Sequence, residues 1–182
     1  MQTKTLTTQV NQNLTRTVVG VLFFTALMAL TARITIPVGP VPITLQLLAV
    51  VLSGLVLGAW GGFAAQVAYL GLIATGLPVD TNAVGAVAFI GPTAGYLIGF
   101  APAAFVTGWL AQRFSGQSWW GNFVAAIAGI FVIYAAGVSW LAYLSGWAVA
   151  WTFGIKPFIL IDLGKAIVAA SVAESGKYWL NR

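Results

Sequence analysis

The chain has 182 residues, of which 60% are hydrophobic and only 6% are charged, and its formal net charge is +5. Soluble domains carry about 25% charged residues, so this composition excludes a water-soluble domain and makes lipid the solvent of most of the surface. The sequence has no cysteine and no histidine, which excludes disulfides, thiolate nucleophiles and imidazole ligands or bases.

Residues 1–16 are polar, with many threonine, glutamine and asparagine side chains. They lack the apolar core and the cleavage site of a secretory signal. We therefore expect a polar N-terminal tail or an interfacial segment over residues 1–16, followed by one transmembrane domain over residues 17–182.

Six apolar stretches in this second part can be delimited by glycine, proline and charged residues. They are 17–32, 42–58, 59–75, 92–111, 121–144 and 157–180. Spanning a bilayer takes about 20 residues per helix, so the first three stretches are short and fit tilted helices around a shared cavity. The sequence predicts an all-α membrane protein with six transmembrane helices. The tight turn at residues 58–62 should join the second and third helices as an antiparallel hairpin.

Three long connections fall on one side of the membrane when the six helices alternate in direction. They are 33–41, 76–91 and 145–156. The first is crowded with proline, which prevents a helix there. The third holds Trp147 and Trp151, and tryptophan is enriched at membrane interfaces.

The distribution of the basic residues near the ends of the apolar stretches predicts how the chain is oriented in the membrane. Two of them, Arg33 and Lys156, lie on the side of the long connections, and five lie on the side of the termini: Lys4, Arg16, Arg113, Lys177 and Arg182. Cytoplasmic loops carry an excess of lysine and arginine. We therefore expect a multi-pass protein of the cytoplasmic membrane with both termini in the cytoplasm, and no nucleic-acid partner.

Asp162 and Lys165 are a charged pair inside the sixth apolar stretch. Residues three apart lie on one face of a helix, and each charge facing lipid would cost roughly 2.5–3.5 kcal/mol. The two side chains must therefore face protein, a cavity or each other. A structural ion pair is one interpretation, and a polar hook in a substrate pocket near the outer end of the helix is the other, which we favour.

Uncharged polar residues in apolar surroundings are further candidates for ligand contacts. Asn82, Thr44 and Gln46 can hydrogen-bond a ligand or a neighbouring helix, and for any one alone the structural role is the simpler interpretation. Tyr96 follows a predicted helix start and is a candidate wall of the cavity. Small residues at four-residue spacing, such as Thr25 and Ala29, let helices approach closely.

The sequence lacks the motifs of covalent catalysis and of nucleotide hydrolysis. It contains no phosphate-binding loop of the G-x-x-x-x-G-K-[ST] type and no metal-ligand cluster or nucleophile elbow. We therefore expect a protein that binds and moves a small solute, without a cofactor, and not an enzyme.

Five blocks in a fixed order resemble the BioY family, the biotin-binding S components of energy-coupling-factor (ECF) transporters. They are Ala-Arg-Ile-Thr-Ile-Pro at 32–37, Val-Pro-Ile-Thr-Leu-Gln at 41–46, Gly-Leu-Pro at 76–78, Gly-Pro-Thr-Ala-Gly-Tyr-Leu-Ile-Gly-Phe at 91–100 and Asp-Leu-Gly-Lys at 162–165. The resemblance covers nearly the whole chain after residue 16.

The resemblance implies a compact six-helix bundle whose cavity opens to the outside and holds biotin as substrate. It implies that Asp162, Lys165 and Asn82 are biotin ligands. It also implies partners, namely a transmembrane coupling protein and two cytoplasmic ATPase subunits. The coupling protein should dock on the small-residue face of the first helix, around Thr25 and Ala29.

Two alternatives remain within the transport class. The chain could be a solitary biotin transporter, or a carrier for another small vitamin. A membrane-embedded enzyme or a scaffold is the alternative from another class, and one aspartate and one glutamate at opposite ends of a helix supply little for catalysis.

Overall fold

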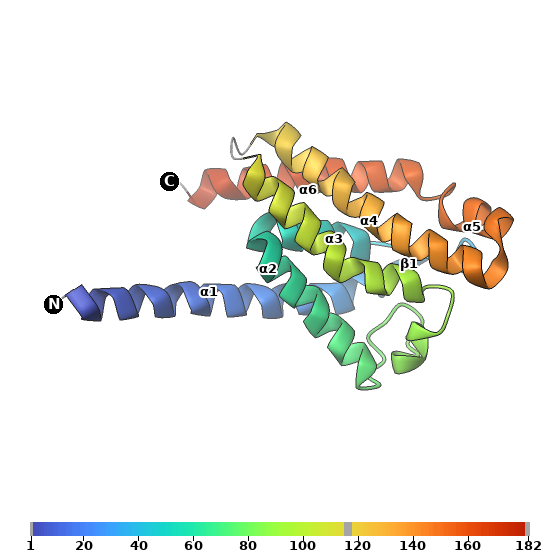
Figure 1. The fold of residues 1–182 in the computed structure, drawn as a ribbon, viewed down its shortest axis with the longest axis horizontal. Helices are drawn as coiled ribbons and strands as arrows, with labels where there is room; N and C mark the ends of the chain where they lie inside the picture. Colours follow the sequence, from blue (N-terminus) through green and yellow to red (C-terminus); the bar gives the residue numbers. More distant parts are fainter. Residues whose placement is uncertain (1, 115–117, 181–182) are drawn as a thin grey trace.

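The described chain is almost entirely helical. The computed structural model describes residues 2–114 and 118–180, and it describes side chains for residues 14–114 and 118–176 (Figure 1). The elements in chain order are α1 (Gln2–Thr31), β1 (Thr35–Ile36), β2 (Ile43–Thr44), α2 (Gln46–Ala74), the 3-10 helix η1 (Gly85–Phe89), α3 (Ala94–Arg113), α4 (Trp119–Ser145), α5 (Trp147–Gly154) and α6 (Ile159–Leu180). Residues 2–16 of the predicted tail form the first part of α1.

The helix α2 is broken at Gly58 and folds back on itself. Gly58 has φ 75° and ψ −176°, a conformation that glycine adopts without steric cost. The Gln46 side chain donates a hydrogen bond to the Tyr69 hydroxyl, and the Gln66 side chain donates to the Ser53 hydroxyl. Each pair joins a residue before the break to a residue after it. The predicted hairpin is therefore confirmed, with one non-helical residue as its turn.

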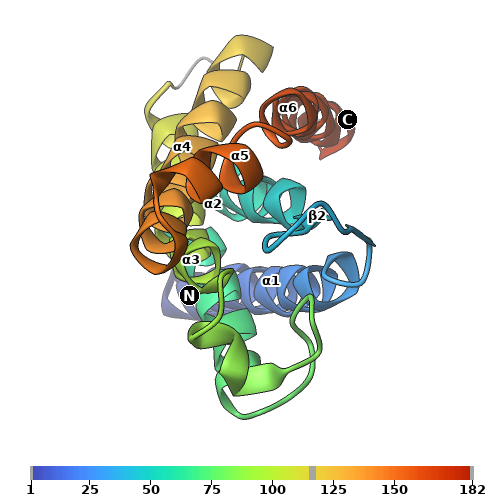
Figure 2. The ribbon, with the colours of Figure 1, turned by 90° about the vertical axis from the view of Figure 1, so that its right-hand side faces the viewer.

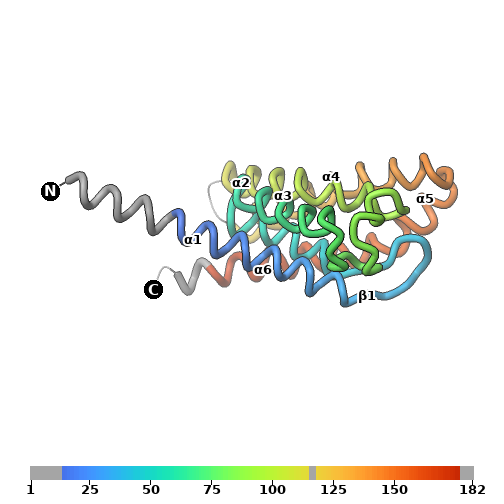
Figure 3. The backbone as a smooth tube through the Cα atoms, turned by 90° about the horizontal axis from the view of Figure 1, so that it is seen from below, coloured from blue at the N-terminus to red at the C-terminus, as the bar shows by residue number. Residues whose placement is uncertain are grey.

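The two halves of α2 approach each other closely at two glycines. A Cβ atom added to Gly62 would lie 2.8 Å from the Cα atom of Gly54, so larger side chains would push the halves apart. This hairpin is the centre of the bundle, since α2 packs against α1, α3, α4 and α6. Along the bundle, α1 and α6 lie on one side, and α3 and α4 lie on the other (Figure 3).

The two ends of the bundle differ in content. The N-terminal part of α1, the Gly58 break, the end of α3, the start of α4 and the C-terminal part of α6 lie together at one end (Figure 1). The opposite end carries the β1–β2 hairpin, η1 and α5. The predicted grouping of the three long connections on one side is therefore confirmed. The side chains of Lys4 and Lys177, and all of Arg182, lie outside the described residues.

The long connections contain more regular structure than the sequence predicts. In an antiparallel pairing Thr35 faces Thr44 and Ile36 faces Ile43, so the proline-rich segment forms the link of a short hairpin. The tryptophan-containing connection forms α5, which begins after Gly146 at φ 84°. Viewed from this end, the β1–β2 hairpin lies between α1 and α6, and α5 links α4 to α6 (Figure 2).

Many of the exposed side chains are large and apolar. Four helices among the described residues are long and apolar enough to cross a membrane, at residues 14–31, 46–74, 94–113 and 119–145. Large side chains such as Trp60, Phe131 and Leu160 expose 72% or more of their area. Helices satisfy their own backbone hydrogen bonds, which a lipid environment requires.

Candidate substrate-binding site

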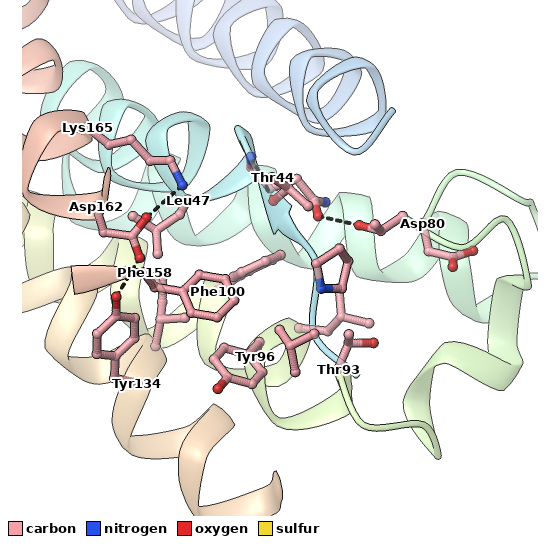
Figure 4. Close-up of a pocket in the computed structure, with 16 residues that line it drawn as sticks. Thr44, Leu47, Asp80, Thr93, Tyr96, Phe100, Tyr134, Phe158, Asp162 and Lys165 are labelled. Atoms are coloured by element: carbon pink, nitrogen blue, oxygen red, sulfur yellow. Dashed lines mark hydrogen bonds and ion pairs between the residues drawn. The ribbon is translucent and has the colours of Figure 1, made fainter. Parts of the chain in front are cut away.

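A cavity lies at the end of the bundle that carries the long connections. The cavity and the open solvent at its mouth together contain about 590 Å³ of empty space. Its lining comes from six parts of the chain, namely the β1–β2 hairpin, the start of α2, the loop after α2, the start of α3, the middle of α4, and the start of α6 with the residue before it. The lining residues are Val41, Pro42, Thr44, Gln46, Leu47, Asp80, Thr81, Thr93, Tyr96, Leu97, Phe100, Ile133, Tyr134, Phe158, Asp162 and Lys165 (Figure 4).

A charged cluster occupies one end of this cavity. Lys165 Nζ donates to Asp162 Oδ1 at 2.6 Å, and the two residues expose only 6% and 1% of their area. Asp162 stands in the first turn of α6, where the helix dipole favours a negative charge. The predicted pairing on one helix face is thus present, and both members line the cavity.

Tyr134 of α4 completes this cluster, and the sequence analysis missed it. Its hydroxyl donates to Asp162 Oδ2 at 2.6 Å, so each carboxylate oxygen has a donor (Figure 4). Tyr134 lies 28 positions before Asp162 in a long apolar stretch, and no spacing links the two residues. A phenol inside an apolar stretch, one of two there with Tyr143, was the one available indication.

Apolar and aromatic side chains form the middle of the cavity. Leu47, Phe100 and Phe158 are among the apolar lining residues, and Phe100 lies between the charged cluster and the opposite end (Figure 4). Tyr96, the predicted wall residue, lines the cavity here. Its hydroxyl donates to the Gly154 carbonyl of α5 at 3.0 Å, so the ring is the part that faces the cavity and the hydroxyl ties α5 to α3.

The opposite end of the cavity is polar and uncharged at its surface. The Gln46 side chain donates to Tyr69 Oη at 2.7 Å and accepts a hydrogen bond from the Thr81 hydroxyl at 2.9 Å. The Thr44 hydroxyl accepts from the Gln46 backbone N–H at 3.2 Å. The predicted residues Thr44 and Gln46 therefore both line the cavity, and Gln46 joins the loop after α2 to the hairpin of α2.

Asn82 does not line the cavity in this structure. It is exposed, and its backbone N–H donates to Asp80 Oδ2 at 3.0 Å. Asp80 Oδ1 accepts from the Gly85 backbone N–H at 2.7 Å, so the Asp80 carboxylate caps the turn that follows it. The role of Asn82 as a ligand stays a prediction. Asp80 is a lining residue that the sequence analysis missed, although aspartate two residues before a turn is typical of this capping.

The predicted docking residues lie on the inner side of α1. Thr25 is buried, and its hydroxyl donates to the Val21 carbonyl at 2.8 Å and to the Ala65 carbonyl of α2 at 3.1 Å. Ala29 is half-buried and packs against the core. The face of α1 that this chain leaves open carries Leu22 and Leu30.

This arrangement defines a multi-pass membrane protein with a binding cavity for a small, partly polar molecule. One end of the cavity offers a carboxylate and an ammonium, the middle is apolar, and the other end offers hydroxyl and amide groups. Such a polar anchor with apolar walls is the usual design of a small-molecule site.

The comparisons with known proteins assign the family. The sequence model described as the BioY family matches residues 1–182, so the chain belongs to the BioY family. The Biotin transporter BioY of Thermotoga maritima is 45% identical over 152 residues, which are 82% of this chain and 89% of that protein. The Biotin transporter BioY of Rhodobacter capsulatus is 41% identical over 175 residues, 87% of this chain and 90% of that protein.

A solved structure shares the fold. The 2.1 Å crystal structure of the S-component for biotin from an ECF-type ABC transporter superposes with a TM-score of 0.85 and 28% sequence identity. The match covers 92% of this chain and 94% of that chain. The predicted six-helix S-component architecture is therefore confirmed, and the family is one of transporters and not of enzymes.

Proposed function

We propose that this chain binds biotin and carries it across the membrane as the substrate-capture component of an ECF-type transporter. The observation that carries the proposal is the charged cluster of Tyr134, Asp162 and Lys165 at the end of an apolar cavity. Membership of the BioY family, whose relatives include proteins described as biotin transporters, supports the same ligand.

The chemistry of biotin complements the cavity. Its ureido ring presents two N–H donors and a carbonyl acceptor, which match the Asp162 carboxylate and the Lys165 ammonium. Its thiophane ring and aliphatic chain match apolar walls such as Leu47, Phe100 and Phe158. Hydrogen bonds to charged groups contribute roughly 1.5–3 kcal/mol each, so the cluster would supply both affinity and orientation. Asn82 remains a proposed ligand, through movement of its loop toward the cavity.

Titration of biotin into the detergent-purified chain tests this function. Saturable binding that Asp162→Asn weakens at least about tenfold is expected, because the substitution keeps the shape and removes the charged acceptor. A folded wild-type chain that binds no biotin would refute the proposal.

The proposed partners are a transmembrane coupling protein and two cytoplasmic ATPase subunits. The span of α1 at residues 14–31 is only 17% buried, the lowest share of the four candidate spans, so most of its surface is available to lipid or to another subunit. Because Thr25 packs against α2, docking through the Thr25 and Ala29 face requires a local shift of α1. Ala26→Leu on the open face and Ala29→Leu on the inner face form a matched pair for co-purification with the partners.

Both termini are proposed to lie in the cytoplasm, from the distribution of basic residues. The chain has no cysteine, so single cysteines report topology without a background. Thr152→Cys in α5 should react with an impermeant thiol reagent in intact cells, and Ser118→Cys at the start of α4 should not. The reverse labelling pattern would refute this orientation.

A further inference from the structure

The cavity has a fixed charge balance that bears on which ligands it accepts. Its charged lining residues are Asp80, Asp162 and Lys165, which gives two carboxylates against one ammonium over the described residues. Lys165 is already paired with Asp162 at 2.6 Å. The described lining therefore holds no cation that is left over for a ligand carboxylate.

The position of each charge sharpens this conclusion. The Asp80 carboxylate is held by the backbone N–H groups of Asn82 and Gly85 and points away from the centre of the cavity (Figure 4). The surface at this end consists of neutral groups, namely the hydroxyls of Thr44, Thr81 and Thr93 and the amide of Gln46. Neutral groups beside a buried carboxylate are a poor environment for a second carboxylate, since a buried charge needs a partner.

The other end of the cavity also disfavours a ligand carboxylate. A carboxylate placed against Lys165 would meet the adjacent carboxylate of Asp162, and like charges repel strongly in a medium of low dielectric constant. A cyclic urea has no such conflict, because its carbonyl accepts from Lys165 while its N–H groups donate to Asp162. The charged cluster thus selects a neutral head that carries both donors and an acceptor.

We infer that this cavity recognises the neutral bicyclic urea and leaves the side-chain carboxylate of biotin unpaired, so that amides and esters of that carboxyl group are ligands as well. This inference rests on the proposed function. The substrate class would then include biotin joined through an amide to an amine, such as the Nε-amide of lysine. Two cations at this end of the bundle, Arg33 and Lys156, are exposed and do not line the cavity.

Competition binding on the purified full chain tests the inference. Bound biotin is displaced with the primary amide of biotin, with the lysine amide and with pentanoate, which keeps a carboxylate and lacks the urea. The primary amide should bind within about threefold of biotin, and pentanoate should not compete. If the cavity paired the biotin carboxylate with a cation, the primary amide would instead bind about ten- to a hundredfold more weakly than biotin.

The outcomes distinguish failure of the inference from failure of the proposed function. Tight biotin binding with an amide at least about tenfold weaker would overturn the inference and leave the proposed function intact. Failure of biotin itself to bind would overturn the proposed function, and the inference with it. The primary amide is the decisive ligand, because it differs little from biotin in size, whereas the lysine amide also tests the room at the mouth.

A variant at the rim provides an independent check. Arg33 donates a hydrogen bond to the Pro78 carbonyl, so Arg33→Gln can disturb the loop and weaken all ligands together. The inference predicts an unchanged ratio of biotin affinity to amide affinity in this variant. A selective loss of biotin affinity would identify Arg33 as a partner of the carboxylate and overturn the inference.

Discussion

The substitution Lys165→Met is the sharpest test of the charged cluster. It removes the ammonium and leaves the Asp162 carboxylate, which is 1% exposed, with Tyr134 as its remaining side-chain donor. Breaking a buried ion pair by removing one partner costs about 3–5 kcal/mol, because the other charge stays uncompensated. We therefore expect a large loss of thermal stability in addition to loss of biotin binding.

The double variant Asp162→Leu with Lys165→Met separates stability from binding. Replacing both members of a buried ion pair with apolar residues of similar volume is often neutral or stabilising. The Tyr134 hydroxyl would lose its acceptor, which costs about 1–3 kcal/mol if it finds no other. The double variant should therefore be more stable than Lys165→Met alone and should bind no biotin.

The measurements are thermal unfolding in detergent and biotin titration for the wild type, Lys165→Met and the double variant. Tyr134→Phe removes a hydrogen bond to the Asp162 carboxylate, worth roughly 1.5–3 kcal/mol, so it should lower thermal stability by less than Lys165→Met does. Biotin affinity at the wild-type level in a folded double variant would refute the assigned site. A Lys165→Met variant as stable as the wild type would show that the unpaired Asp162 carboxylate does not destabilise the fold.

Three further predictions concern packing and buried hydrogen bonds, each measured as a change in thermal unfolding. Gly62→Val should destabilise the α2 hairpin by about 1–3 kcal/mol through overpacking. Gly71→Val should not show this loss, because an added Cβ there meets nothing within 4 Å. Equal effects of the two substitutions would contradict the close approach of Gly62 to Gly54. Thr107→Val should leave stability unchanged or raise it, because this buried hydroxyl has no hydrogen-bond partner among the described residues. Thr25→Val loses the bond to Ala65 and should lower stability by about 0.5–1.5 kcal/mol. A Thr107→Val variant less stable than Thr25→Val would refute this reasoning. Tyr96→Phe should lower stability by a similar amount through the lost bond to Gly154 and change biotin affinity little; a tenfold loss of affinity would show that the hydroxyl contacts the ligand.

Local sequence features predicted much of the candidate site. Asp162 and Lys165 are three residues apart on one helix, so their contact follows from helix geometry alone. Thr44 and Gln46 were candidates because polar groups in apolar segments need partners, and both line the cavity. Tyr134 and Asp80 were missed, because their places in the cavity depend on contacts between segments that are distant in the sequence or on the path of a loop.

The sequence by itself determined the solvent, the number of crossing segments and the grouping of the long connections on one side of the bundle. Composition requires lipid, and glycine, proline and charge delimit the apolar segments. Only the tertiary structure decided which face of each helix points inward, as with Thr25 against α2 and Tyr134 toward Asp162. The physical reason is that lipid-facing and core-facing side chains are both apolar in a membrane protein, so hydrophobic periodicity does not distinguish the two faces. The rotation of each helix is then set by close packing and by polar contacts between helices, which no single segment contains.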